Sequence, residues 1–241
     1  MIKVQIVGTK NKVDFVMYLS RTIVSQNKRV LVVDSTVRNE YLYALADHNS
    51  NEMIFELQGV EIMKCGKSWL EVESVLKNEG ESINHYDCVI VDMDNIHSVS
   101  KEWGKFNYSF YVSDCNRFNL NRDIKLLHEL ADRNDELILD RVHFDEGFSI
   151  PSGYLDLLMN NRINYKGEPY EIEYDDRLNS LFLEMQHEQY IPLKKLDKAY
   201  KALLIDLTVE WFGMQGSDVK KGINKGLFNK FKFKSKKESL V

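Results

Sequence analysis

Cysteine and proline are both scarce in this sequence, with 3 of each among 241 residues. The low proline count argues against long linkers that lack regular structure. The cysteines, Cys65, Cys88 and Cys115, are far apart and odd in number. We therefore expect free thiols in a reducing compartment, rather than disulfides or a metal site. Cys88 lies inside an apolar run, which predicts that it belongs to the core.

Several functional signatures are also missing. No apolar run approaches the ~18 residues that span a membrane, and the opening MIKVQIVG predicts a strand rather than a signal peptide. We therefore expect a cytoplasmic protein. The 6 histidines show no metal-ligand spacing, and a GxGxxG motif is absent, which argues against a dinucleotide-dependent enzyme. A receiver domain is disfavoured because Gly8 and Thr9 stand where its acidic pair would follow the first strand.

Apolar runs instead alternate with amphipathic segments along the chain. Strands are predicted at 2–8, 28–36, 59–64, 85–95, 107–114, 136–142 and 168–176, and helices at 13–26, 69–80, 120–132 and 193–213. The runs in the second and fourth strands are nearly continuous, as in parallel strands that are buried on both faces. This alternation predicts an α/β fold with a doubly wound, mostly parallel sheet and helices on both faces. Ligands of such sheets bind beyond the carboxyl ends of the strands.

Five segments, in order, resemble parts of one known family: KRVLVVDST (28–36), YDCVIVDMDN (86–95), VSDCNRFNLNRDIKLLHEL (112–130), ILDRV (138–142) and the stretch from YEIEYDD to the last helix (170–204). Together they resemble the ParA/MinD family of deviant P-loop ATPases over about residues 1–213. The second segment is similar to that family's Walker B strand. The resemblance implies a P-loop NTPase-like fold and a nucleotide site at the loop after the first strand.

That loop departs from the family pattern. The family carries a glycine-rich run, two lysines and a Ser or Thr, which wrap and neutralise phosphates and hold Mg²⁺. This chain has only Gly8-Thr9-Lys10-Asn11-Lys12, followed by Val13 in place of the Mg²⁺-binding hydroxyl and by Asp14. Without the glycines the loop cannot easily form a phosphate nest. The resemblance therefore indicates a degenerate Walker A loop.

Further departures concern the other strand ends. Thr36 stands where the family has the aspartate that orients the attacking water, and Asp140 replaces the asparagine of an adenine-facing Asn-Arg pair. The remnant nucleotide site would comprise Gly8, Thr9, Lys10, Asn11, Lys12, Asp34, Asp92 and Asp140. Each charged residue also has a plainer interpretation: Asp34 and Asp92 cap strand ends, and Lys12 is a solvated first-turn residue. We expect no catalytic residue and no resident cofactor or metal, while Lys10, Lys12 and Asp92 leave room for weak binding of ATP and Mg²⁺.

The last part of the chain is basic, whereas the protein as a whole carries a net charge of −5. We expect a domain over 1–213 and a basic, partly amphipathic tail over 214–241. Residues 218–241 hold eight lysines against two acidic residues, a local balance of +6, so the remainder carries −11. A helix over 219–231 would align Val219 and three of the apolar contact residues on one stripe. The predicted membrane or partner contacts are Ile223, Leu227, Phe228, Phe231, Phe233, Lys221, Lys225, Lys230 and Lys232.

Three interpretations of the tail stay open: contact with an anionic membrane, a disordered or protein-binding segment, and nucleic-acid binding. The sequence favours a non-hydrolysing ParA/MinD-like adaptor that helps to position or assemble a larger machine, such as a pilus, secretion, conjugation, division or partition apparatus. Its partners would be proteins of that assembly, a second copy or an active relative, at the inner face of the cell membrane. The alternatives are an active ATPase with an unconventional phosphate loop and a DNA-associated partition or regulatory protein.

Overall fold

The computed structural model describes residues 1–46, 52–64, 66–99, 101–133, 137–148, 150 and 153–225. Its strands are β1 (Ile2–Val7), β2 (Val30–Ser35), β3 (Ile54–Leu57), β4 (Val60–Lys64), β5 (Cys88–Met93), β6 (Tyr108–Asp114), β7 (Ile138–Asp145), β8 (Asn164–Tyr165) and β9 (Tyr170–Glu173). Its helices are α1 (Val13–Val24), α2 (Glu40–Leu45), α3 (Trp69–Asn78), α4 (Arg117–Arg133), α5 (Tyr154–Leu158), α6 (Asp176–Glu188), α7 (Lys198–Phe212) and α8 (Gly216–Lys225).

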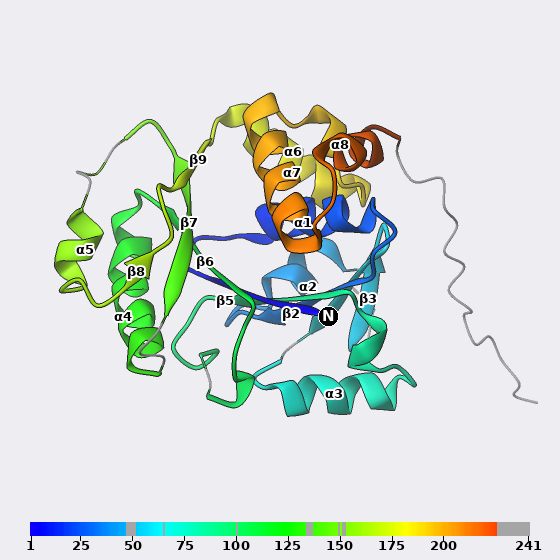
Figure 1. The fold of residues 1–241 in the computed structure, drawn as a ribbon, viewed down its shortest axis with the longest axis horizontal. Coiled ribbons are helices and arrows are strands. Elements are labelled where there is room, and N and C mark those ends of the chain that lie inside the picture. Colours follow the sequence, from blue (N-terminus) through cyan, green and yellow to red (C-terminus); the bar gives the residue numbers. More distant parts are fainter. Residues whose placement is uncertain are drawn as a thin grey trace, which may run out of the picture.

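All nine described strands belong to one sheet. Its order is β3-β4-β2-β5-β1-β6-β7-β8, with β9 paired to β7. Among the described strands, every pairing is parallel except that of β3 with β4. Every residue of β2 and β5 is buried, because helices cover both faces of the sheet, as their apolar runs predict. The predicted doubly wound α/β fold is therefore confirmed (Figure 1).

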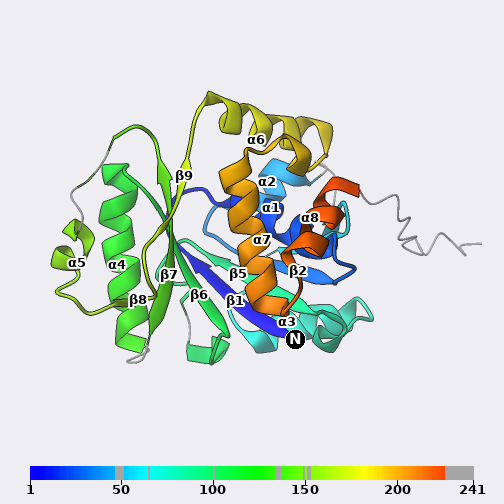
Figure 2. The same cartoon turned by 45° about the horizontal axis from the view of Figure 1, so that its top comes forward.

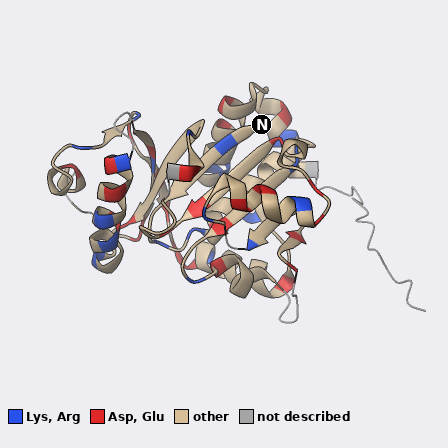
Figure 3. Ribbon diagram, turned by 90° about the horizontal axis from the view of Figure 1, so that it is seen from below, with Lys and Arg blue, Asp and Glu red and all other residues tan. Residues whose placement is uncertain are grey.

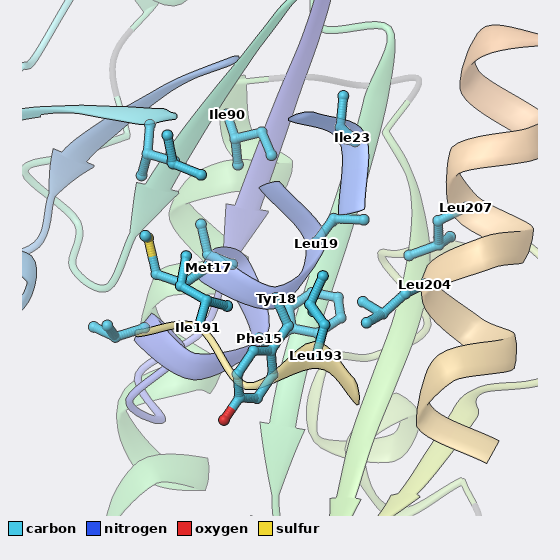
Figure 4. Close-up of a cluster of buried hydrophobic side chains, with 14 of the residues drawn as sticks. Phe15, Met17, Tyr18, Leu19, Ile23, Ile90, Ile191, Leu193, Leu204 and Leu207 are labelled. Atoms are coloured by element: carbon cyan, nitrogen blue, oxygen red, sulfur yellow. The ribbon is translucent and has the colours of Figure 1, made fainter. Parts of the chain in front are cut away.

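The helices divide between two apolar cores. One core joins one face of the sheet to α1, α2, α6, α7 and α8, and the other joins the opposite face to α3 and α4. Helix α1 is buried along its whole length, since the sheet lies on one side of it and α7 and α8 pack on the others (Figure 2). Phe15, Leu19 and Ile23 of α1 lie in this first core with residues of α7 (Figure 4). The helix that follows the loop at Gly8–Lys12 is thus held rigidly.

The predicted boundary at residue 213 is wrong, because the packed domain continues through α8. Val219 and Ile223 of α8 are buried in the first core, and the Gln26 amide at the end of α1 donates to the Val219 carbonyl. Burial gives these two apolar side chains a stabilising role in the domain. Ile223 is therefore not available for the predicted membrane or partner contact, and this prediction is wrong.

The other predicted tail contacts are only partly described. The Lys221 ammonium lies 3.0 Å from the Asp218 carboxylate on the same helix, and Lys225 is the last residue of α8. The remaining predicted contacts lie outside the described residues: Leu227, Phe228, Lys230, Phe231, Lys232 and Phe233. No helix among the described residues is long and apolar enough to cross a membrane.

Candidate functional site

The loop between β1 and α1 lies where the strand order changes direction. Strand β1 has β5 on one side and β6 on the other, in parallel register, so the carboxyl ends of the three strands meet at one edge. Gly8 continues the pairing, because its amide donates to the Met93 carbonyl at 3.1 Å. This is the position at which open α/β sheets bind their ligands.

Lys12 is turned into the protein rather than toward solvent. Its side chain is fully buried, and its Nζ lies 2.9 Å from Oδ1 of Asp92. The same ammonium donates to the carbonyls of Gly8 and Lys10. An ammonium has three protons, and this one faces three oxygens of the protein, the two carbonyls and the carboxylate with which it forms an ion pair. The interpretation of Lys12 as a solvated first-turn residue is wrong, and no donor is left over for a phosphate in this conformation.

Asp92 is enclosed as completely as its partner. Its Oδ2 accepts a hydrogen bond of 2.6 Å from the hydroxyl of Tyr41, which is itself buried. Burial by itself would lower the pKa of Lys12, but the adjacent Asp92 carboxylate outweighs that effect and the pKa is raised. Burial also raises the pKa of Asp92, but the charge of Lys12 and the hydrogen bond from Tyr41 oppose that rise. The 2.9 Å contact holds the two groups as an ion pair, which links the loop to β5.

The middle of the loop is fixed to α4. The Thr9 amide donates to Oδ1 of Asp123 at 2.7 Å, and the Thr9 hydroxyl donates to the Asn119 carbonyl at 3.0 Å. Asp123 is buried and also accepts a bond of 2.9 Å from the Tyr111 hydroxyl. A backbone amide that could face a ligand is thus already bound by a side chain of the protein.

Lys10 is held in a different pocket, next to two aromatic rings. Its Nζ lies 4.7 Å from the ring centre of Phe144 and 4.5 Å from that of Tyr174. Carboxylate oxygens of Glu146 and Asp114 lie 3.6 Å and 4.0 Å away. Cation–π contact and paired carboxylates stabilise the charged lysine in this position. The two lysines of the loop therefore lie in different surroundings: Lys12 contacts Asp92, and Lys10 contacts Phe144, Tyr174 and Glu146.

The first turn of α1 is capped from within. The Asn11 side-chain oxygen accepts from the amide of Val13 at 3.1 Å, and Oδ1 of Asp14 accepts from the amide of Phe15 at 2.8 Å. Free amides at a helix start are what make it an anion site. Burial raises the pKa of Asp14, while the charge of Lys10 opposes the rise. A carboxyl group thus stands where a helix start would otherwise receive phosphate.

Asp34 caps the end of β2, as its plainer interpretation predicts. Its Oδ1 accepts from the amide and the hydroxyl of Thr36 at 3.0 and 2.6 Å, and its Oδ2 accepts from the amide of Tyr41 at 3.3 Å. Burial raises the pKa of Asp34 to about 6. Thr36, which replaces the expected carboxylate, contributes to this cap and leaves no acid at its position.

Asp140 does not join the other site residues. Strand β7 continues to Asp145, so Asp140 lies inside the strand and not at its carboxyl end. It stands four residues before Phe144, or roughly 13 Å along the strand, and its carboxylate lies 3.9 Å from Lys166. The prediction that Asp140 belongs to the remnant nucleotide site is wrong, because it placed the end of this strand too early.

The sequence-based prediction missed Tyr41, Glu40 and Asp123. The two residues of α2 carry no motif, because only the fold brings them to Asp92. Asp123 did leave a signal: it falls on the apolar stripe of α4 with Leu120 and Leu127, so its burial could have been anticipated. Among the described residues no group of three or more Cys, His, Asp or Glu side chains has the geometry of a metal site.

Glu40 makes the stability of this region depend on pH. Burial, followed by the charge of Asp92, raises the pKa of Glu40 to about 7 from an ordinary value of 4.5. Between these values the folded protein holds more protons than the unfolded chain, so this group destabilises the protein as pH rises toward 7. We expect Glu40→Gln to be more stable than the wild type by up to about 3 kcal/mol near pH 8, since each pKa unit is worth about 1.4 kcal/mol. Urea unfolding should show the two proteins equal near pH 4, and an equal difference at both pH values would contradict this origin.

Comparison with known proteins agrees with this architecture. No protein-family model and no curated protein matches the chain. Solved structures do match, among them a ParA family ATPase from Chlorobium tepidum, with 15% identity, a TM-score of 0.59, and coverage of 86% of this chain and 97% of that one. MinD in the MinC:MinD cell division complex of Aquifex aeolicus follows with 12% identity, a TM-score of 0.55, and coverage of 89% and 97%. This chain has the ParA/MinD fold.

A third solved structure shows the same ParA/MinD fold with a nucleotide bound. It is a putative plasmid partition protein from Borrelia burgdorferi bound to AMPPNP, with 12% identity, a TM-score of 0.52, and coverage of 94% of this chain and 99% of that one. At such identities the similarity concerns the fold.

Proposed function

We propose that this protein is a non-hydrolysing adaptor with the ParA/MinD fold, which helps to position or assemble a larger cellular machine through protein contacts. One observation carries the proposal: the fully buried ammonium of Lys12 is taken up by Asp92 and by two loop carbonyls. A lysine that binds phosphate has to present its charge to the ligand. Here the same charge links the loop to the sheet.

The residues around Lys12 support the same proposal. Val13 offers no hydroxyl for Mg²⁺, and Thr36 supplies no carboxylate for an attacking water. Loss of one such preorganised contact typically costs about 10²–10³ in rate, and this chain lacks several. The charged groups of the loop are instead engaged in internal hydrogen bonds and ion pairs, which suits a fixed shape rather than a switch.

The solved structures with the same fold favour protein partners for this chain. The neighbours include MinD in complex with MinC and a putative plasmid partition protein, so the fold serves in division and partition systems. Four exposed apolar side chains lie in or near the carboxyl-end loops of this chain: Val37, Ile96, Phe118 and Phe148. Apolar groups around a closed site suit contact with another protein.

The tail supports a place at an anionic membrane surface. The packing of α8 assigns Val219 and Ile223 to the core, so the segment to test is 226–241, which carries five lysines among its residues. Basic residues near an anionic leaflet contribute about 1 kcal/mol each. The chain as a whole is acidic. We therefore expect this basic segment, rather than the rest of the chain, to be attracted to an anionic membrane.

Co-sedimentation with anionic liposomes tests both parts of the proposal. We expect the full chain to bind vesicles that contain phosphatidylglycerol, and to bind equally with and without Mg-ATP. Truncation after Lys225 should abolish binding and leave the thermal unfolding temperature unchanged, because α8 is kept. Binding that requires Mg-ATP would contradict the adaptor, and binding that survives the truncation would contradict the role of the tail.

A further inference from the structure

The first half of α4 carries a cationic surface whose charges are not paired with carboxylates of the described residues. Arg117, Asn121 and Lys125 are exposed at intervals of one turn, and Arg122 lies beside them with its guanidinium 5.4 Å from the ring centre of Phe118. We call these five residues the α4 patch. Figure 3 shows basic segments along α4. No carboxylate among the described residues lies within ion-pair distance of the three cations.

The acidic residues of α4 are all used elsewhere. Asp123 faces inward and binds Thr9, Glu129 pairs with Arg133, and Asp132 pairs with Arg162. The first turn of α4 contains no acidic residue, although a helix start favours acids and disfavours cations. Arg117 therefore occupies a position that the helix itself does not favour, on a chain whose net charge is −5.

An exposed aromatic ring adds an apolar element to this surface. Phe118 is 62% exposed, and it lies one turn from Arg122 on the same face. Aromatic and arginine side chains are the residues most often central to protein interfaces. The patch is also rigid, because Thr9 binds both Asp123 and the Asn119 carbonyl and so fixes the start of α4 to the loop.

We propose that the α4 patch binds an acidic segment of a partner protein, in an extended conformation. One turn of α4 advances about 5.4 Å, and alternate residues of an extended chain are about 6.6 Å apart. Carboxylates at alternate positions of such a segment would therefore meet Arg117 and Lys125, which are two turns apart, within about four residues. The inference rests on the proposed adaptor function only in taking the partner to be a protein.

The size of the patch argues against nucleic acid. Proteins that hold duplex DNA by its backbone typically neutralise about 6–10 phosphates, whereas the patch offers three cations on an acidic protein. Three contacts would leave an affinity too low to resist physiological salt. A membrane is also disfavoured, because one exposed ring gives little apolar area for insertion.

The test compares two charge-reversed proteins with the wild type. Arg117→Glu/Lys125→Glu removes the patch, and Lys77→Glu/Lys198→Glu is the matched control. Both change the net charge equally, and both place an acid at the first residue of a helix, α4 or α7. The probe is a fluorescent peptide of about 12 residues in which Glu alternates with Leu or Gly, and its Gln counterpart is the control probe.

We expect the Glu peptide to bind the wild type and the control protein with equal Kd, and the patch variant at least about tenfold more weakly. The Gln peptide should bind none of them. Arg117→Glu/Lys125→Glu should also melt no lower than the wild type, because the helix start prefers an acid. Equal binding by both reversed proteins would overturn the proposal, as would tighter binding of a 20-base-pair duplex that is lost in the patch variant. Neither result would bear on whether the protein binds ATP.

Discussion

Replacing Lys12 with Met is expected to lower the free energy of unfolding by about 3–5 kcal/mol, the usual cost of removing one partner from a buried ion pair. The change leaves the Asp92 carboxylate buried with only the Tyr41 hydroxyl as a strong donor, and it also frees the carbonyls of Gly8 and Lys10. Urea unfolding followed by circular dichroism measures the loss. A lysine poised for phosphate would be partly solvated, and its replacement would change stability by less than about 1 kcal/mol.

A second substitution separates the ion pair from simple packing. Lys12→Met combined with Asp92→Asn removes the unpaired charge and keeps an acceptor for Tyr41, so we expect it to recover a substantial part of the lost stability. Lys28→Met is the matched control, because Lys28 pairs with Asp87 at 3.0 Å in a half-exposed position. That variant should lose at most about 1 kcal/mol. Equal losses in Lys12→Met and Lys28→Met would refute the ionic link between the loop and β5.

Gly8→Ala is expected to cost about 3–4 kcal/mol, from two causes that act together. The backbone at Gly8 has φ of +139°, which side chains with a Cβ rarely adopt, and a Cβ there would lie 2.1 Å from the Val112 carbonyl oxygen. That oxygen belongs to β6, so relief requires β1 and β6 to move apart. Thermal and urea unfolding should both show the loss.

Gly80→Ala provides the comparison, since Gly80 also has a positive φ, of +75°, but a Cβ there would meet no atom within 4 Å. It should cost only about 1 kcal/mol for its backbone conformation. If the two substitutions cost the same, the close approach of the loop to β6 would not be a structural requirement. The single glycine kept from the phosphate loop would then have no role in the fold.

The sheet could be predicted from the sequence because its central strands are buried on both faces. Strands β2 and β5 are nearly continuous apolar runs, and α1, α3, α4 and α7 have helical spacing, so each of these elements can be recognised from its own residues. The short elements β3, β8, α2 and α5 cannot, since each has only two to six residues and is too short to show a clear period. Helix α8 was misassigned because its pattern of apolar and basic residues is the same whether the apolar side faces a core or a membrane.

The location of the candidate site could be predicted from the sequence, but the contacts of its side chains could not. The strand ends located Gly8, Lys12, Asp34 and Asp92 together, because parallel strands bring their carboxyl ends to one edge. The direction of the Lys12 side chain could not be predicted, since it depends on Tyr41 and on the loop carbonyls. The local sequence does not distinguish a lysine that is buried and paired from one that is exposed and binds phosphate.

The central claim is that the ammonium groups of Lys10 and Lys12 and the amides of Gly8, Thr9 and Val13 are engaged within the protein, so that the loop offers no phosphate site. Thermal unfolding of the full chain with increasing ATP, ADP or GTP, each with and without Mg²⁺, tests it most directly. The Chlorobium tepidum ParA family ATPase, assayed in parallel, serves as the control. A ligand at 100 times its Kd stabilises a protein by about 2.7 kcal/mol. We predict no saturable increase in the unfolding temperature with any nucleotide, and a saturable, Mg²⁺-dependent increase with ATP would contradict the account.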